Sequence, residues 1–281
     1  MVILVTGASG QLGQAIQHIA PDYTDCQFIF ASSQELDITN QEKVNQFFEH
    51  NKIDFCINAA AYTAVDKAES ETDKAESINV LGPKNLAFAC KKHHVKLIHI
   101  STDFVFDGAS KQPYLETDAT SPINVYGKTK RDGEVVIIEN LKEYFIVRTS
   151  WVYSQFANNF MKTMLRLASE RDSLSIVSDQ VGSPTNAVDL AKATLSIVKS
   201  NSTAYGIYNF SNEGMASWYD FAKEIFRINN IAIEVSPIPS EAFPTPAIRP
   251  KYSVLSKSKI KEVFGIEIKI WQEALQQTHN L

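Results

Sequence analysis

Residues 2–13 read VILVTGASGQLG, an apolar run followed at once by glycines at positions 7, 10 and 13. Val2–Thr6 has the composition of a buried parallel strand, and Leu12–Ile19 has the periodicity of an amphipathic helix. A strand, a glycine-rich turn and a helix in this order are typical of a dinucleotide-binding unit. Glycines let backbone N–H groups approach a pyrophosphate, and the helix N-terminus supplies partial positive charge. We therefore expect Gly7, Gly10 and Gly13 to bind a cofactor, with a tight structural turn as the alternative.

Strand and helix patterns alternate through the first 150 residues. Short apolar runs predict further strands over Gln27–Ala31, Phe55–Asn58, Leu97–Ser101 and Phe145–Thr149. Helical periodicity predicts helices over Leu12–Ile19, Gln41–His50, Asp73–His93 and Lys128–Asn140. This alternation predicts an α/β fold with a doubly wound parallel sheet, the Rossmann architecture. We expect residues 1–150 to form this dinucleotide-binding domain.

The pattern loosens after residue 150. Residues 151–281 are expected to form mainly a smaller α/β substrate-binding lobe, with some segments returning to the first sheet. Helices are expected over Asn159–Glu170 and Trp218–Ile228, and strands near Leu174–Val177 and Ile207–Phe210. Ser236–Pro250 carries five of the ten prolines of the chain, which predicts an irregular surface segment.

Composition excludes several classes of protein. A net charge of −5 gives no electrostatic footprint for nucleic acid. No run approaches the roughly 20 apolar residues that a membrane-spanning helix needs. The N-terminus lacks the features of a signal peptide, and three scattered cysteines suit neither a disulfide framework nor a zinc site. We expect a cytoplasmic protein without nucleic-acid or membrane partners.

The second predicted strand bears on the choice of coenzyme. An acidic residue about 20 residues beyond the glycines usually binds the ribose 2′-hydroxyl. Here the strand ends Ala31-Ser32-Ser33, with neither an acid nor an arginine at its tip, and Glu35 is expected to lie past the pocket. Ser32 can accommodate either a 2′-phosphate or a 2′-hydroxyl, so NADPH is favoured only slightly and NADH stays possible.

Two further segments fit the same pocket. Asp37 lies after the second strand, where it can meet the adenine amino group, or it can cap the helix that starts near Asn40. The third strand ends in the small residues Asn58-Ala-Ala-Ala61, which leave room for a ribose, although an ordinary strand-to-turn transition has similar residues.

Tyr126 and Lys130 are four residues apart and share one face of a predicted helix. A tyrosine has a pKa of about 10 and is a poor acid–base catalyst at neutral pH. A neighbouring ammonium would lower this pKa, so the pair predicts a general acid. Thr102 follows the fourth predicted strand, at the edge where a doubly wound sheet binds its ligands, and can hydrogen-bond a substrate carbonyl. Alternatively, the tyrosine and the lysine have this spacing by chance and are exposed to solvent. The alternative for Thr102 is a purely structural role at the end of the strand.

Longer stretches resemble the extended, nucleotide-sugar branch of the short-chain dehydrogenase/reductase superfamily and, within it, the dTDP-4-dehydrorhamnose reductase family. The resemblance runs from residue 1 to about 275. Its most specific motifs are Asn58–Ser70, Ser101–Gly108, Pro122–Lys130, Arg148–Tyr153 and Asp179–Thr185.

The resemblance implies a role for each matching residue. Thr102, Tyr126 and Lys130 would be the catalytic residues, with Tyr126 as proton donor and Lys130 also holding the nicotinamide ribose. Residues implied to contact the cofactor elsewhere are Gly10, Gln11 and Leu12 at the pyrophosphate, Asp37 and Ile38 at the adenine side, and Ala61, Tyr62 and Thr63 at the ribose and nicotinamide. Residues implied to contact the sugar nucleotide are Val65, Thr102, Asp103, Trp151 and, near the diphosphate, Arg249.

The implied reaction is the reduction of the C4 ketone of dTDP-4-dehydro-6-deoxy-L-mannose to dTDP-L-rhamnose, the last step of dTDP-rhamnose synthesis for cell-surface polysaccharide. Related dehydratases carry an Asp-Glu pair directly after the catalytic threonine, and the pair Asp103-Phe104 here favours a reductase. The alternatives are a noncatalytic NADP-binding regulatory subunit, and an epimerase or reductase of a related nucleotide sugar.

One position departs from the family. Some members dimerise through a magnesium ion held by a glutamate two residues past the last glycine of the turn, and this chain has Ala15 there. We therefore expect no metal site, and a monomer or weak homodimer.

Overall fold

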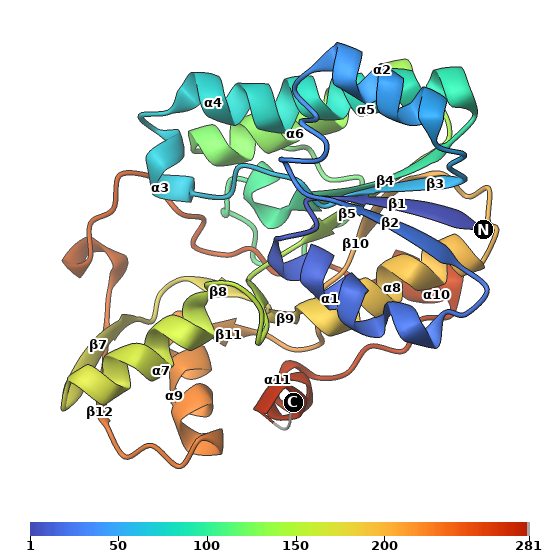
Figure 1. The fold of residues 1–281 in the computed structure, drawn as a ribbon. Helices are drawn as coiled ribbons and strands as arrows, with labels where there is room; N and C mark the ends of the chain where they lie inside the picture. The colour runs from blue at the N-terminus through green and yellow to red at the C-terminus, as the bar shows by residue number, and fades with distance from the viewer. Residues whose placement is uncertain (280–281) are drawn as a thin grey trace.

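A parallel sheet of six strands forms the centre of the computed structural model, which describes residues 1–279 (Figure 1). The strands lie in the order β10-β5-β4-β3-β1-β2, and every neighbouring pair is parallel. Their bounds are Val2–Thr6 (β1), Gln27–Ala31 (β2), Phe55–Asn58 (β3), Lys96–Thr102 (β4), Tyr144–Thr149 (β5) and Gly206–Asn209 (β10). The predicted doubly wound α/β fold is confirmed.

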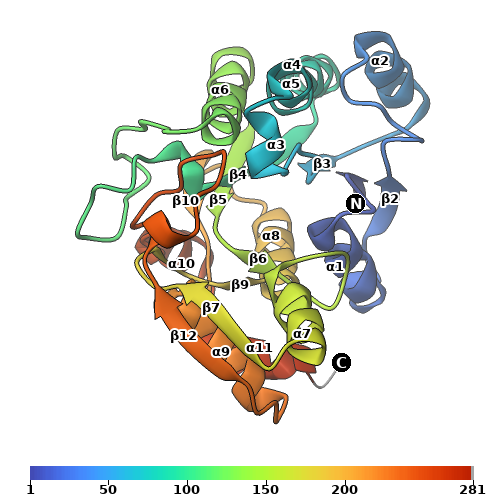
Figure 2. The same ribbon diagram turned by 90° about the vertical axis from the view of Figure 1, so that its left-hand side faces the viewer.

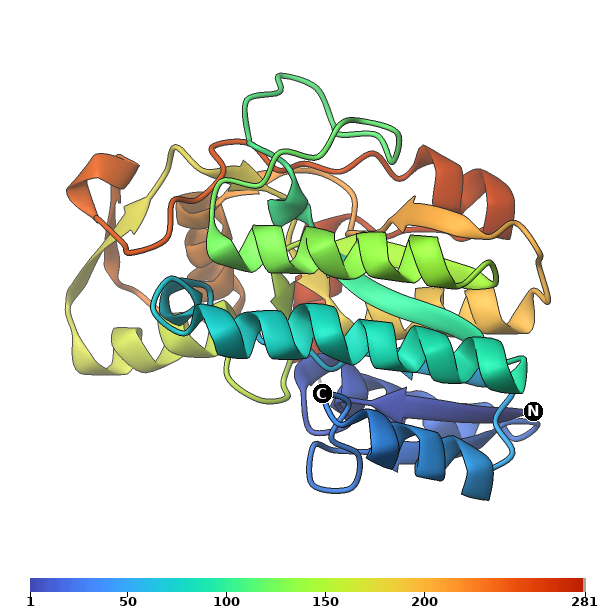
Figure 3. The same cartoon turned by 90° about the horizontal axis from the view of Figure 1, so that it is seen from above.

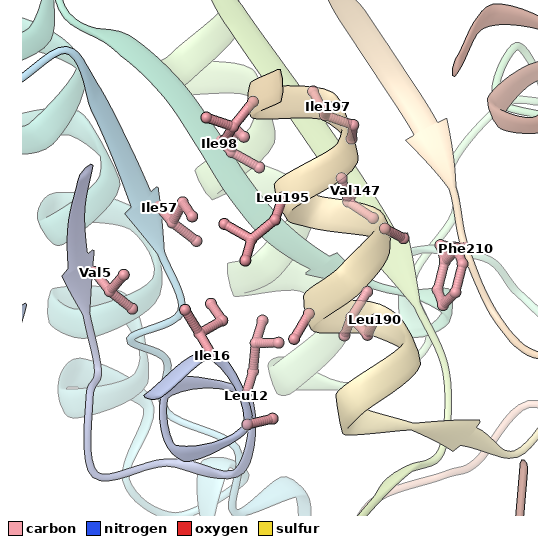
Figure 4. Packing of buried hydrophobic residues seen from close by; sticks show 14 of the residues in the cluster. Val5, Leu12, Ile16, Ile57, Ile98, Val147, Leu190, Leu195, Ile197 and Phe210 are labelled. Atoms are coloured by element: carbon pink, nitrogen blue, oxygen red, sulfur yellow. The ribbon is translucent and has the colours of Figure 1, made fainter. Parts of the chain in front are cut away.

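Helices cover both faces of this sheet. α2 (Gln41–His50), α5 (Gly82–His93) and α6 (Val125–Asn140) lie side by side on one face (Figure 3). α1 (Gln11–Ile19) and α8 (Ala187–Lys199) lie on the other face. Figure 4 shows how the second face is filled: aliphatic side chains of α1 and α8 pack against those of β1, β3, β4 and β5. Both faces of the sheet are therefore buried, as expected when its strands are apolar along their whole length.

The helix expected over Asp73–His93 is interrupted. α4 (Thr72–Glu76) is followed by a π-helical turn, Ser77–Leu81, before α5 begins. Pro83 explains the change, because it has no N–H to donate to the carbonyl of Asn79 one turn earlier. The wider turn directs the Asn79 side chain away from the helix and toward the candidate site.

The helix expected over Lys128–Asn140 begins earlier, at Val125. The side chain of Asn124 caps it by accepting the N–H of Gly127 at 2.7 Å. This cap places Tyr126 in the first turn of α6, beside the carboxyl ends of the strands.

The remaining elements form a smaller lobe beside the carboxyl ends of the strands (Figure 2). It has its own apolar cluster, which joins α7 (Phe160–Glu170), α9 (Trp218–Ile228) and α11 (Trp271–His279) to the pair of strands β7 (Ser173–Val177) and β12 (Glu234–Ile238). Shorter strands are β6 (Val152–Tyr153), β8 (Val181–Gly182), β9 (Thr185–Asn186) and β11 (Ala216–Ser217). α8 and β10 return to the large sheet, and α10 (Ser258–Phe264) contacts β10.

The expected irregular segment Ser236–Pro250 is partly a strand. Its first residues, including Pro237, belong to β12, whose one partner strand within residues 1–279 is β7. An edge strand tolerates proline because one side of its backbone needs no ladder partner. A short 3-10 turn, Ser240–Ala242, and irregular chain follow. Within residues 1–279, no helix combines the length and the apolar character needed to cross a membrane.

Candidate active site

Three chain segments meet where the parallel strands end. Gly7 follows β1, Thr102 is the last residue of β4, and Tyr126 lies in the first turn of α6. In a doubly wound fold, this edge of the sheet is the place where ligands bind. The sheet topology therefore brings together the glycine turn and the three predicted catalytic residues.

The glycine turn leaves no room for side chains. Gly7 has a φ of 68°, and a Cβ there would lie 2.5 Å from the backbone nitrogen of Ala60. A Cβ on Gly13 would lie 2.5 Å from the carbonyl oxygen of Gly7. Gly10 begins α1 without a side-chain cap, and the first turn has no acidic residue. The free N–H groups at this helix end fit a pyrophosphate.

Gln11 has a second role that the sequence did not reveal. Its amide donates to the carbonyl of Val152 at 3.1 Å and accepts from Ser154 and Asn159 at 2.9 and 3.0 Å. The side chain of Gln11 thus joins the first helix to the lobe, while its backbone N–H stays at the helix end. Leu12 is buried in the core below the turn.

An acidic side chain lies at the end of β2. The backbone N–H of Ser32 donates to the carboxylate of Glu35 at 2.7 Å, and its hydroxyl also donates to Glu35. The carboxylate of Glu35 therefore lies against the end of β2, and its place relative to the cofactor stays a prediction. These hydrogen bonds lower the pKa of Glu35, so its carboxylate is charged at neutral pH.

The helix cap that was the alternative role of Asp37 is made by another residue. Asn40 caps α2, because its side chain accepts the N–H of Lys43 at 3.0 Å. Asp37 instead accepts from the backbone and hydroxyl of Thr39, at 3.0 and 2.7 Å. Ile38 is buried against Gly82, where any side chain would collide with it.

The loop after β3 is held by Asn79, a residue that sequence analysis missed. Its side-chain oxygen accepts the N–H of Tyr62 at 2.8 Å, and its amide donates to the Tyr62 carbonyl and the Thr129 hydroxyl, both at 3.1 Å. Asn79 therefore connects the predicted cofactor loop, with Ala61 and Thr63 on either side of buried Tyr62, to the helix of Tyr126. Pro83 was the sequence feature that could have pointed to Asn79, because it causes the π-helical turn in which Asn79 lies.

The phenol of Tyr126 lies close enough to the hydroxyl of Thr102 for that hydroxyl to favour the phenolate and lower the pKa of Tyr126. The ring of Phe104 packs edge-on against Tyr126, with centroids 5.7 Å apart. Burial raises the pKa of Tyr126 to about 12, and nearby Asp103 acts in the same direction. The expected lowering of this pKa by Lys130 is therefore wrong for the structure as it stands, because desolvation dominates.

Lys130 is buried under the end of β4. Its amine donates to the carbonyl of Ile100 at 2.7 Å and lies 3.4 Å from His99 Nε2. Burial lowers the pKa of Lys130 to about 8, although the carboxylate of Glu134 opposes this shift. The amine thus changes charge close to physiological pH.

Asp103 has an unused oxygen. The hydroxyl of Thr102 donates to its Oδ1 at 3.0 Å, but Oδ2 is buried and has no hydrogen-bond partner among residues 1–279. Burial raises the pKa of Asp103 to about 6. A buried acceptor without a partner carries a desolvation cost that a ligand hydroxyl can remove.

The lobe supplies an aromatic pair and an arginine. Trp151 stacks on Trp218 with ring centroids 3.5 Å apart and planes within 5° of parallel. Arg249 donates two hydrogen bonds to Asp66, at 3.0 and 2.7 Å. Asp66 lies on α3 (Val65–Ala68), so Arg249 joins the lobe to the predicted substrate residue Val65. Its expected contact with a diphosphate stays a prediction.

A buried ion pair lies beneath this site and was also missed. Arg148 donates to both carboxylate oxygens of Glu134, at 2.9 and 2.7 Å, and Ser101 donates to the same carboxylate. Both charged side chains are 3% exposed. The pair fixes α6 against β4 and β5.

Comparisons with known proteins show the family to which the chain is related. The model of the RmlD substrate binding domain family matches residues 1–280. A dTDP-4-dehydrorhamnose reductase from Aggregatibacter actinomycetemcomitans is 41% identical over 98% of this chain and 97% of the relative. A solved dTDP-4-dehydrorhamnose reductase from Clostridium acetobutylicum superimposes with a TM-score of 0.96 at 45% identity, over 100% of this chain and 99% of the other. A solved reductase from Bacillus anthracis, in complex with NADP, gives a TM-score of 0.94 at 40% identity, over 99% and 98% of the two chains.

Proposed function

The chain belongs to the RmlD substrate binding domain family, and we propose that Thr102, Tyr126 and Lys130 are the residues with which it reduces the C4 ketone of dTDP-4-dehydro-6-deoxy-L-mannose. It is an NADPH-dependent oxidoreductase that carries out the reduction step of dTDP-rhamnose synthesis. The observation that carries the residue assignment is that the side chains of Tyr126 and Thr102 lie close together at the end of β4, at the same edge of the sheet as the glycine turn.

Tyr126 acts as the proton donor. Its pKa of about 12 keeps the phenol protonated at neutral pH, which is the form that a donor needs. Reduction adds a hydride to C4 and a proton to the carbonyl oxygen, and the phenol supplies that proton. When substrate binds, the Thr102 hydroxyl turns its proton from Asp103 to the same oxygen and keeps that oxygen within reach of Tyr126.

Lys130 supplies positive charge below the site. In its charged form, the ammonium stabilises the phenolate that Tyr126 becomes after it has given up its proton. Since the pKa of Lys130 is about 8, this charge is present at pH 7 and is lost as the pH rises through 8. We expect the rate of reduction to fall over the same interval.

The cofactor residues fit a dinucleotide. The cradle around Gly7 and Gly13 and the uncapped start of α1 suit the pyrophosphate, and the loop of Ala61, Tyr62 and Thr63 lies between the glycine turn and α6. NADPH supplies the hydride when it is bound. Glu35 at the tip of β2 is an acid of the kind that binds a ribose 2′-hydroxyl, so NADH is tested beside NADPH.

The substrate residues fall into two groups. Asp103 offers its unpartnered Oδ2 to a sugar hydroxyl next to the reacting carbonyl. Val65, Trp151 and Arg249 come from α3 and the lobe, where an aromatic wall and a guanidinium suit a nucleotide diphosphate. Phe104 packs against Tyr126 and has no acid–base group, so the site lacks the second acid–base residue that the elimination of water needs.

The direct test is NADPH consumption in the presence of enzymatically made dTDP-4-dehydrorhamnose. We expect oxidation that depends on the substrate, with dTDP-L-rhamnose as the product, and a parallel assay with NADH measures the coenzyme preference. Cofactor binding without oxidation would favour the noncatalytic regulatory subunit or a different nucleotide sugar. A cytoplasmic location, a monomeric or weakly dimeric state and the lack of nucleic-acid, membrane or metal partners stay predictions from the sequence.

A further inference from the structure

His99 lies in the middle of β4 and is completely buried, between Asn58 on β3 and Lys130 on α6. Its Nδ1 lies 3.0 Å from the amide nitrogen of Asn58, and its Nε2 lies 3.4 Å from the amine of Lys130. A buried histidine between an amide and a lysine must take one definite tautomer, because each ring nitrogen faces a fixed group.

The orientation of Asn58 is determined by groups that can act in only one way. The backbone N–H of Ala60 donates to Asn58 Oδ1 at 3.2 Å, and the hydroxyl of Thr6 donates to the same oxygen at 2.7 Å. Since a backbone N–H cannot accept, Oδ1 must face it and Nδ2 must face His99. The amide then donates to Nδ1 of His99, so this ring nitrogen carries no proton.

The proton of the neutral ring is consequently on Nε2, directed at Lys130. A neutral amine can accept this N–H, whereas an ammonium opposes it with N–H groups of its own. We infer that His99 is a positioning residue: Thr6 and Asn58 lock its imidazole in the Nε2–H tautomer, and this tautomer sets the pH at which Lys130 loses its charge. The inference rests on the proposed function only in assigning Lys130 to the reduction.

The other groups around Lys130 act in different directions. Glu134 on the same helix favours the ammonium, but two hydrogen bonds from Arg148 and one from Ser101 already occupy its carboxylate. Ile100 on β4 accepts one N–H of the lysine. Burial and His99 both favour the neutral amine, in accord with the lowered pKa values of Lys130 and His99.

The first test reads the tautomer directly in the full chain without ligands. ¹⁵N NMR of the imidazole nitrogens distinguishes Nε2–H from Nδ1–H rings, and His99 is assigned by the loss of its signals in His99→Gln. His50 is an internal reference with the opposite tautomer, because its Nδ1 lies 2.7 Å from the carbonyl oxygen of Gln46. We expect His99 to carry its proton on Nε2 and its signals to move as Lys130 titrates near pH 8, a movement that is absent in Lys130→Met. An Nδ1–H ring, a charged ring or signals that ignore Lys130 would overturn the inference.

The second test reverses the tautomer. In Asn58→Asp, the oxygen that replaces Nδ2 can only accept a hydrogen bond, so it favours the tautomer with the proton on Nδ1, and Nε2 becomes an acceptor for the ammonium. We expect the basic limb of the kcat–pH profile to move up by about one pH unit or more. In Asn58→Asp combined with His99→Leu, the ring that transmits the effect is gone, and the profile should match that of His99→Leu alone. A shift that survives in the double variant would show that the new charge acts directly on Lys130, and the role assigned to His99 would be wrong.

If the wild-type protein had no reductase activity, the proposed function would be contradicted. The NMR result on the tautomer of His99 would be unaffected, because it is measured without substrate or cofactor. The two failures are therefore distinguishable.

Discussion

The Rossmann half and the lobe build their shares of the site in different ways. In the Rossmann half, the predicted residues lie within a few positions of a strand end, as Gly7 does after β1 and Thr102 at the end of β4. In the lobe, the contacts join distant segments: Trp151 stacks on Trp218, and Arg249 binds Asp66. The sheet register fixes the first group, whereas the second group depends on how the two halves pack.

This difference predicts that the two halves contribute to different steps, the Rossmann half to the chemical reaction and the lobe to binding of the sugar nucleotide. Residues on strand ends are held rigidly by the hydrogen bonds of the sheet, which suits hydride and proton transfer. Residues of the lobe reach the Rossmann half through side-chain hydrogen bonds such as those of Gln11 to Val152 and Asn124 to Ile248. We expect changes in the first group to affect kcat and stability, and changes in the second to affect the KM for the sugar nucleotide.

The largest expected effect is that of Tyr126→Phe. Removing the phenolic proton should lower kcat by about 10²–10⁴-fold, while the affinity for NADPH stays within a few-fold because the ring is retained. Steady-state assays and a fluorescence titration with NADPH measure the two quantities. Tyr144→Phe, at the opposite end of the sheet, is the matched control and should leave kcat unchanged. Near-normal turnover in Tyr126→Phe would exclude this tyrosine as the donor.

Arg148→Met tests how rigidly α6 is held. It leaves the buried carboxylate of Glu134 without its cation, and we expect the free energy of unfolding to fall by about 3–5 kcal/mol. Urea denaturation measures the loss, and adding Glu134→Leu should recover most of it. Lys251→Met removes a lobe ion pair whose side chains are 68% and 72% exposed, and it should change stability very little. If Arg148→Met and Lys251→Met lowered the free energy of unfolding equally, the buried ion pair would not hold α6 more firmly than an exposed pair holds the lobe.

Asp103 lies where the halves meet, since Thr102 of β4 donates to it and the hydroxyl of Ser253 is close enough to act against the rise in its pKa. Its pKa rises from 3.8 to about 6 on folding, so the folded protein binds more protons than the unfolded chain between these values, and stability falls as the pH rises through them. Asp103→Asn removes this cost and should stabilise the protein by about 2–3 kcal/mol at pH 8. In urea denaturation, the difference from wild type should shrink to about 0.5 kcal/mol near pH 4 and vanish below pH 3. A difference that is independent of pH would disprove the assigned cause.

The smallest effect is expected for Arg249→Met. Loss of charge-assisted hydrogen bonds to a diphosphate should raise the KM for the sugar nucleotide by about 10–100-fold and leave the affinity for NADPH unchanged. Lys251→Met is again the control, as a neighbouring exposed cation. If the affinity for NADPH fell as well, Arg249 would contribute to the cofactor site. The proposal that lobe residues act only on the sugar nucleotide would then be wrong.

The sequence was most informative where chemistry is local. The glycine turn, the strand that ends at Thr102 and the spacing of Tyr126 and Lys130 all lie within short segments, and the structure places them together. The predicted helix bounds were wrong where a single side chain determines where a helix begins or is interrupted. Asn124 starts α6 three residues early, and Pro83 widens one turn of a long helix.

The sequence by itself determined the parallel sheet and the residue types at its carboxyl edge, because strand periodicity and glycine spacing are properties of consecutive residues. Only the tertiary structure decided the electrostatics. Burial, which depends on every element packed around a group, raises the pKa of Tyr126 and lowers that of Lys130, the reverse of what their spacing suggested for the tyrosine. The contacts of His99 with Asn58 and Lys130 likewise join three separate elements, β3, β4 and α6, and no local pattern specifies such an arrangement.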